Sequence, residues 1–171
     1  TGDGGVFYLE STIELLLRNC FIKNNQANSG GFSFGGSWKI NNSKFESNSS
    51  YNDGGVFSDI YSIYIINSLF RRNSAINAGG VFNRFTSANN DGGFESINCL
   101  FENNISGSTG AILYAQNHNP INRMSLTINE CVFFNNLANN GSIIDYRPYV
   151  SNVMIINNNI FHSNVYNDGA C

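Results

Sequence analysis

The sequence predicts an all-β protein, a right-handed single-stranded parallel β-helix (solenoid) of about six coils. Three observations predict it: a small-residue pair that recurs every 24 to 31 residues, a Phe-x-x-Asn motif in the same phase, and a period-two alternation before each Phe. A repeat of this length without a helical pattern cannot bury its own apolar face. Successive copies must therefore stack.

Each repeat opens at a corner made by two small residues, usually followed by apolar ones. Glycine at such a corner admits a tight turn where a Cβ would clash. The chirality of parallel connections favours right-handed winding. The corner pairs are Gly4-Gly5, Gly30-Gly31, Gly54-Gly55, Gly79-Gly80, Gly110-Ala111, Gly141-Ser142 and Gly169-Ala170.

A strand precedes each recurring Phe, because apolar residues alternate there with polar ones. We expect two or three short strands in each repeat. The intervening, outward position holds Lys39, Tyr64, Glu95 and Thr127. The inward positions, seven and five residues before the Phe, are Glu14, Trp38, Ile63, Phe94, Leu126 and Met154, then Leu16, Ile40, Ile65, Ser96, Ile128 and Ile156.

The Phe-x-x-Asn motif closes each repeat and predicts two structural ladders. Stacked coils place the Phe side chains in one internal column and the Asn side chains in another at a bend. Each Asn there can bond its own turn and the Asn of the next coil. The predicted ladders are Phe21, Phe45, Phe70, Phe101, Phe133 and Phe161, and Asn24, Asn48, Asn73, Asn104, Asn136 and Asn164.

These paired motifs resemble the repeats of the polymorphic membrane proteins, the autotransporter adhesins of chlamydiae. They also resemble the wider pectin-lyase-like β-helix superfamily and the β-helical surface proteins of protists. The resemblance covers essentially the whole chain. It implies a passenger or stalk domain that is displayed, extracellularly, at a cell surface.

Composition narrows the function classes. Charged residues make up 12% of the chain, the net charge is -3, and no Lys/Arg cluster occurs, which argues against nucleic acid as a partner. No apolar run is long enough to span a membrane in this segment, and no metal or cofactor pattern is present. We expect one β-helix domain over residues 1–171, as a segment of a longer chain or a stacking filament unit.

The function we expect is that of an extracellular structural or adhesive solenoid: a surface stalk, an adhesin passenger or a filament subunit. Expected partners are other copies of the chain or flanking β-helix segments stacked end to end, with glycans or host and cell-surface proteins as further candidates. The chain starts and stops in the same phase of the repeat, so one copy could continue another. We expect the protein not to be an enzyme, and we assign no catalytic residue.

The alternative is a carbohydrate-active enzyme, a polysaccharide lyase or hydrolase, or a glycan-binding module. The longer repeats place insertions after the fourth, fifth and sixth corners, and such insertions often form a binding face. Carboxylates are sparse there, which weighs against catalysis. The candidate ligand-binding residues are Arg84, His118, Arg123, Tyr146, Arg147 and Tyr149.

Two modifications can be anticipated. Cys99 and Cys131 share a column in adjacent coils, so a disulfide is geometrically feasible, and a buried thiol ladder is equally compatible. Cys20 is expected to face outward. Of the sequon asparagines, Asn140 and Asn41 are the glycosylation candidates, because Asn48 and Asn104 belong to the ladder.

Overall fold

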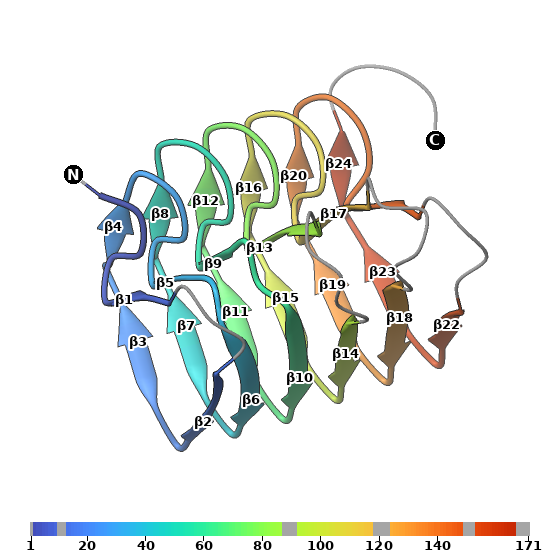
Figure 1. The fold of residues 1–171 in the computed structure, drawn as a ribbon. Coiled ribbons are helices and arrows are strands. Elements are labelled where there is room, and N and C mark those ends of the chain that lie inside the picture. Colours follow the sequence, from blue (N-terminus) through green and yellow to red (C-terminus); the bar gives the residue numbers. More distant parts are fainter. Residues whose placement is uncertain (1, 10–12, 87–91, 118–123, 149–152, 167–171) are drawn as a thin grey trace.

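The computed structural model describes residues 2–9, 13–86, 92–117, 124–148 and 153–166, and these form a parallel β-solenoid without a helix (Figure 1). The chain winds through four strands in each coil, rather than the two or three expected. Every strand pairs in parallel with its counterpart one coil away. Four parallel sheets, named A to D below, therefore line one shared interior.

Sheets A and B carry the longer strands. Sheet A contains β1 (Phe7–Tyr8), β5 (Ser33–Phe34), β9 (Phe57–Ser58), β13 (Phe82–Thr86), β17 (Leu113–Asn117) and β21 (Ile144–Arg147). Sheet B contains β2 (Glu14–Arg18), β6 (Ser37–Asn41), β10 (Ser62–Ile66), β14 (Gly92–Ile97), β18 (Met124–Asn129) and β22 (Met154–Asn157).

Sheets C and D follow after two successive bends. Sheet C contains β3 (Phe21–Lys23), β7 (Lys44–Glu46), β11 (Leu69–Arg71), β15 (Leu100–Glu102), β19 (Val132–Phe134) and β23 (Ile160–His162). Sheet D contains β4 (Gln26–Ala27), β8 (Ser49–Ser50), β12 (Ser74–Ala75), β16 (Ile105–Ser106), β20 (Leu137–Ala138) and β24 (Val165–Tyr166).

The number of turns follows from the sheets. Each sheet has six strands, one from each layer, so the described chain makes about five complete turns between the first layer and the last. The expected count of about six coils is slightly high when complete turns are counted. Adjacent layers in a parallel ladder lie about 4.8 Å apart, so the solenoid grows along its axis by that distance per coil.

The Phe column fills the interior beside sheet C. Phe45, Phe70, Phe101 and Phe133 are fully buried, and together with Phe161 they stack ring on ring. Successive ring centroids lie 4.7, 5.3, 5.0 and 4.5 Å apart, with interplanar angles of 3 to 16°. The spacing between layers is thus close to the distance at which aromatic rings stack. Because the repeat is in register, each Phe ring lies at a favourable stacking distance from the ring of the next coil.

The first layer departs from the predicted register by one residue. Ile22, not Phe21, pairs with Phe45, and the Phe21 side chain is 55% exposed. The same shift puts Leu15 and Leu17 inward, in place of Glu14 and Leu16. The turn before the strand fixes this register: Asn19 adopts a left-handed φ of 55°, and Asn42, Asn67 and Asn98 are left-handed too, with φ of 47°, 52° and 49°. Counting from Asn19, rather than from Phe21, gives the observed alignment.

The Asn ladder runs beside the Phe column and shows the same shift. Asn25, not Asn24, is its first member, because Asn24 occupies the left-handed turn position instead, with φ 57°. In the interior, the Asn73 backbone N–H and its Nδ2 both donate to Asn104 Oδ1 at 3.0 Å. Asn73 Nδ2 also donates to the Phe45 carbonyl at 3.1 Å.

This pattern continues through the ladder. Asn48, Asn73, Asn104 and Asn136 have no exposed surface, and every one donates to the Asn of the following layer. A buried amide is costly unless it is bonded. The ladder satisfies these amides by using each layer as the partner of the next.

The corner glycines are required where two layers meet. Gly54 adopts φ +63°, and a Cβ there would lie 2.0 Å from the Phe57 carbonyl oxygen. A Cβ on Gly55 would lie 2.1 Å from the Gly80 carbonyl oxygen of the following layer. The first glycine is thus needed for its own turn, and the second for the close approach of the next coil.

We predict that Glu46 stays ionised far into the acid range. Its carboxylate lies 2.7 Å from both Lys44 Nζ and Arg71 Nη2. The hydrogen bond from Lys44, then that from Arg71, lowers the pKa of Glu46 from 4.5 to about 2. Because the folded-state pKa is lowered, these ion pairs favour folding above pH 4.5 and lose that effect as pH falls through about 2.

A carbon-13 NMR titration of Glu46 measures this pKa directly. Arg71→Met should raise it, because one of the two cations is then removed. A wild-type midpoint at 4.5 would contradict the ion-pair geometry.

Candidate functional site

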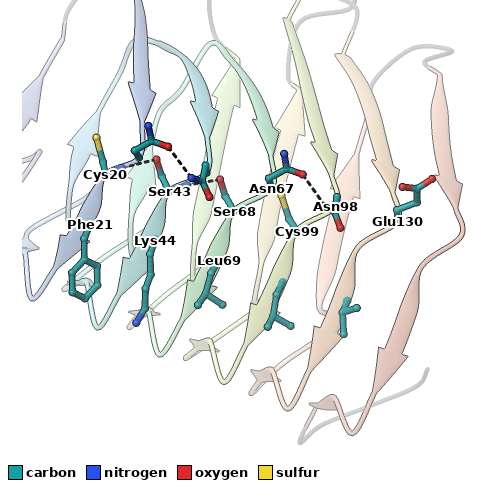
Figure 2. Close-up of a pocket in the computed structure, with 14 residues that line it drawn as sticks. Cys20, Phe21, Ser43, Lys44, Asn67, Ser68, Leu69, Asn98, Cys99 and Glu130 are labelled. Carbon is teal, nitrogen blue, oxygen red and sulfur yellow. Dashed lines mark hydrogen bonds between the residues drawn. The ribbon is translucent and has the colours of Figure 1, made fainter.

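A groove runs along the solenoid axis at the bend between sheets B and C (Figure 2). Its volume is about 710 Å³, and its lining comes from five successive layers. Each of the first four layers contributes the left-handed turn residue, the small residue after it and the first residue of the sheet C strand, and the fifth layer contributes the first and third of these. The lining is Asn19, Cys20, Phe21, Asn42, Ser43, Lys44, Asn67, Ser68, Leu69, Asn98, Cys99, Leu100, Glu130 and Val132.

One wall of the groove is a row of amide side chains. Asn42 Nδ2 donates to Asn19 Oδ1, and Asn98 Nδ2 donates to Asn67 Oδ1, both at 2.7 Å. Their left-handed backbone explains why Asn stands there, since Asn tolerates this conformation better than most residues. The amides still face solvent, where they can exchange partners with a ligand.

The other wall is largely apolar. Phe21, Leu69, Leu100 and Val132 point outward from sheet C in one column, which continues to Ile160. Lys44 interrupts it, with its ammonium 4.7 Å from the centroid of the Phe21 ring. The groove thus sets an amide row opposite an aliphatic row, and the only carboxylate in its described lining is Glu130.

The floor between the walls is a second ladder of short polar groups. The backbone N–H of Cys20 donates to Ser43 Oγ, and that of Ser43 donates to Ser68 Oγ, both at 3.1 Å. Each hydroxyl also donates to the carbonyl two residues earlier, as Ser43 does to Asn41. These side chains therefore hold the bend together. Cys20 belongs to this column and does not face outward as expected.

Cys99 and Cys131 continue the floor as free thiols, so the disulfide is not formed. Both thiols are buried, with Cys99 3% and Cys131 0% exposed. Each thiol donates to the carbonyl two residues earlier, at 3.2 and 3.3 Å. The contact with Cys131, together with burial, raises the pKa of Cys99. The buried thiol ladder is the alternative that the structure shows.

Of the predicted ligand-binding residues, Arg84 lies inside the solenoid. Its side chain is 2% exposed, and Nη1 donates to the Gly92 carbonyl at 2.9 Å. Among the residues that the structure describes, Nε and Nη2 find no hydrogen-bond partner. Burial lowers the pKa of Arg84 to about 10, so the guanidinium stays protonated at neutral pH.

Arg84→Met is expected to leave stability unchanged or to raise it by about 1 kcal/mol. A buried cation carries a desolvation cost that an apolar side chain of similar length avoids. Urea denaturation of both chains measures the difference. A loss of more than about 2 kcal/mol would show that the Gly92 bond outweighs desolvation.

Tyr146 and Arg147 lie on β21, and both already contact other groups of the protein. The Tyr146 hydroxyl donates to the Met124 carbonyl. Arg147 forms two hydrogen bonds to Asp145, at 2.7 and 2.6 Å, and its guanidinium lies 5.4 Å from the Tyr114 ring centroid. His118, Arg123 and Tyr149 lie outside the described residues. Because Arg84 is buried, it cannot belong to an exposed binding face, and that part of the expectation is wrong. A binding face made by the other five residues stays a prediction.

The sequons differ in accessibility. Asn140 is exposed and Asn41 is half-buried at the end of β6, whereas Asn48 and Asn104 have no exposed surface. A glycan on either ladder residue would break the bonds that satisfy the buried amides. Modification of Asn140 and Asn41 stays a prediction.

The described residues contain no group of three or more His, Cys, Asp or Glu side chains that could hold a metal ion. They also contain no helix long and apolar enough to cross a membrane. No protein-family model, curated protein or solved structure matches the chain.

Proposed function

We propose that the chain is an extracellular structural module, a rigid stalk or surface filament whose role is extension and display. The observation that carries this proposal is the continuity of its ladders. The interior of every layer is completed by the next layer, through stacked Phe rings and bonded Asn amides. A solenoid of this kind is a spacer whose length follows from its coil count.

The likeness of its motifs to chlamydial polymorphic membrane proteins and to the pectin-lyase-like superfamily supports the same proposal. In that setting the chain is part of an adhesin passenger. The fold is shared by enzymes and scaffolds, so the family assignment and the adhesive role rest on the motif resemblance alone.

Surface labelling tests the location. An antibody raised against the folded chain should stain intact cells of the source organism as strongly as permeabilised ones. Staining that requires permeabilisation would contradict an extracellular role.

Coil deletion tests the spacer. Removing residues 54–78, one repeat from corner to corner, should leave a folded chain whose axis is shorter by about 4.8 Å. Small-angle scattering and circular dichroism measure both properties. A deletion chain that fails to fold, while single-site variants in the same coil do fold, would show that the coils are not interchangeable.

A second candidate function is binding of a neutral linear glycan in the groove of Figure 2. Amide groups opposite an apolar wall supply the hydrogen bonds and the nonpolar contact that a sugar requires. Glycoside hydrolysis uses a pair of carboxylates, so a lining with Glu130 alone favours a binder over a hydrolase at this groove.

A glycan array tests this second candidate. A positive polysaccharide should lose affinity about tenfold in Leu69→Ala, which removes apolar contact from the groove wall. Tyr64→Ala, on the outward face of sheet B, is the matched control. Equal loss in both variants would exclude the groove as the site.

A further inference from the structure

The amide row of the groove is interrupted between two of its inner members. Asn42 Nδ2 donates to Asn19 Oδ1, and Asn98 Nδ2 donates to Asn67 Oδ1, as Figure 2 shows for the second pair. In the described structure no hydrogen bond joins the side chains of Asn67 and Asn42, although these residues stand in adjacent layers. The Asn67 Nδ2 donor and the Asn42 Oδ1 acceptor are therefore both open to a ligand.

Both amides belong to inner layers. Asn42 lies between β6 and β7, and Asn67 lies between β10 and β11, so a described coil flanks each of them on both sides. Both side chains are exposed. Layers in a parallel ladder lie about 4.8 Å apart, so the open donor and the open acceptor are neighbours along the solenoid axis.

The middle of the groove carries no unpaired charge among the described residues. The Lys44 ammonium lies 2.7 Å from the Glu46 carboxylate and 4.7 Å from the centroid of the Phe21 ring. Glu130, the carboxylate of the described lining, stands two layers beyond Asn67. The middle thus offers one partial positive charge, on an N–H, and one partial negative charge, on a carbonyl oxygen. This pair complements a neutral secondary amide, which has one acceptor and one donor, rather than a sulfate, a carboxylate or an ammonium group.

An aliphatic side chain faces these two amides. Leu69 begins the sheet C strand of the same layer as Asn67 and points outward into the groove, half-buried, with Leu100 beside it in the next layer (Figure 2). An acetamido group carries a methyl on its carbonyl carbon, and contact with Leu69 removes that methyl from water. Donor, acceptor and apolar contact together match the three parts of an acetamido group.

A pendant amide fits this row better than a peptide backbone does. An extended peptide presents an amide at every residue and requires a run of open donors and acceptors, such as the edge of a sheet supplies. The neighbouring amides of the row are already bonded to one another, Asn42 to Asn19 and Asn98 to Asn67. An amide on a side branch, as in an N-acetylated sugar, matches the gap between Asn42 and Asn67.

We propose that the middle of the groove binds the acetamido group of an N-acetylated linear glycan. This inference rests on the second candidate function, glycan binding in the groove, and names the class of sugar. Asn67 Nδ2 donates to the acetamido carbonyl, the acetamido N–H donates to Asn42 Oδ1, and the methyl lies against Leu69. The rest of the glycan follows the aliphatic row along the solenoid axis.

Two oligosaccharides that differ in this group alone test the proposal. Chitotetraose and cellotetraose share their linkage and ring configuration, but chitotetraose carries an acetamido group where cellotetraose carries a hydroxyl. In isothermal titration calorimetry the wild-type chain should bind chitotetraose about tenfold more tightly, because the acetamido group adds two hydrogen bonds and an apolar contact.

Asn67→Gly and Asn42→Gly remove the donor and the acceptor separately. Both positions adopt a left-handed φ, of 52° and 47°, which glycine accepts, so each turn keeps its conformation. In each variant the affinities for the two sugars should differ by less than about threefold. Asn103→Gly, at a left-handed turn outside the groove lining, is the matched control and should keep the wild-type preference.

Equal or absent binding of the two sugars by the wild-type chain, or a preference that survives both groove substitutions, overturns the acetamido site. Competition by N-methylacetamide with the affinity of chitotetraose would assign the gap to any secondary amide, a peptide included, and also overturns it. The second candidate function is judged separately. A polysaccharide that binds on the array and loses affinity in Leu69→Ala establishes glycan binding in the groove, whichever sugar it contains.

Discussion

Asn104→Ala is expected to lower the free energy of unfolding by about 4 kcal/mol, because one truncation breaks a ladder in both directions. The Asn73 N–H and Nδ2 lose their shared acceptor, and the Phe70 carbonyl loses a donor at 2.9 Å. All of these groups are fully buried or lie beside fully buried side chains, so water cannot replace the amide without opening the coil.

The neighbouring Asn103 provides the control. It adopts φ 55° at the turn and does not belong to the ladder, so Asn103→Gly keeps the backbone conformation and should change stability by less than about 1 kcal/mol. Equilibrium urea unfolding, followed by both fluorescence and circular dichroism, measures the two variants. Similar losses in both would mean that the turn, and not the amide ladder, is the stabilising element.

Much of the fold could be predicted from the sequence because each layer repeats the same physical problem. The corner glycines, the alternation of the sheet B strands and the motif around Phe70 recur in one phase, and the structure stacks them in that phase. Period alone, however, does not resolve a one-residue shift when alternatives are adjacent. Phe21 and Ile22 both suit an interior column, and Asn24 and Asn25 both suit a ladder.

The candidate groove was not predicted, and the reason is physical. Its Asn row and its Ser/Cys floor were visible as small or polar positions before each Phe, but a polar turn is ordinary in any β protein. What makes a groove is the stacking of that turn over five layers beside an outward apolar column. Asn42, Asn67 and Asn98 all adopt the left-handed conformation at this turn. Aligning the repeats on these Asn residues would have placed the turns of successive layers in one row.

Arg84 was predicted to be a binding residue, but the structure buries it. An arginine in a long repeat was expected to reach a binding face, yet period-two alternation on β13 turns it inward, two residues after the buried Phe82. A strand pattern fixes orientation more strongly than residue type does. The cation is consequently buried, and within the described ranges it forms one hydrogen bond, to the Gly92 carbonyl.

Phe70→Ala is expected to cost about 4 kcal/mol, the range found when a fully buried Phe is truncated in a close-packed core. Its ring stacks on Phe45 at 4.7 Å and on Phe101 at 5.3 Å, and it also packs edge-on against Phe82 at 5.1 Å. Those partners belong to three different strands, β7, β15 and β13. None can move into the vacated space without leaving its own ladder, so the cavity should persist.

Phe21→Ala separates the observed register from the predicted one. In the predicted register Phe21 and Phe70 lie in the same internal column, and truncating either one would lower the free energy of unfolding by a similar amount. In the structure the Phe21 ring is largely solvent-exposed and contacts Lys23 and Lys44, so its loss should change stability by less than about 1 kcal/mol. Ile22→Ala should cost more than Phe21→Ala, because Ile22 fills the ladder position in the first layer. The reverse order, measured by urea unfolding of the two variants, would mean that the first coil adopts the Phe21 register.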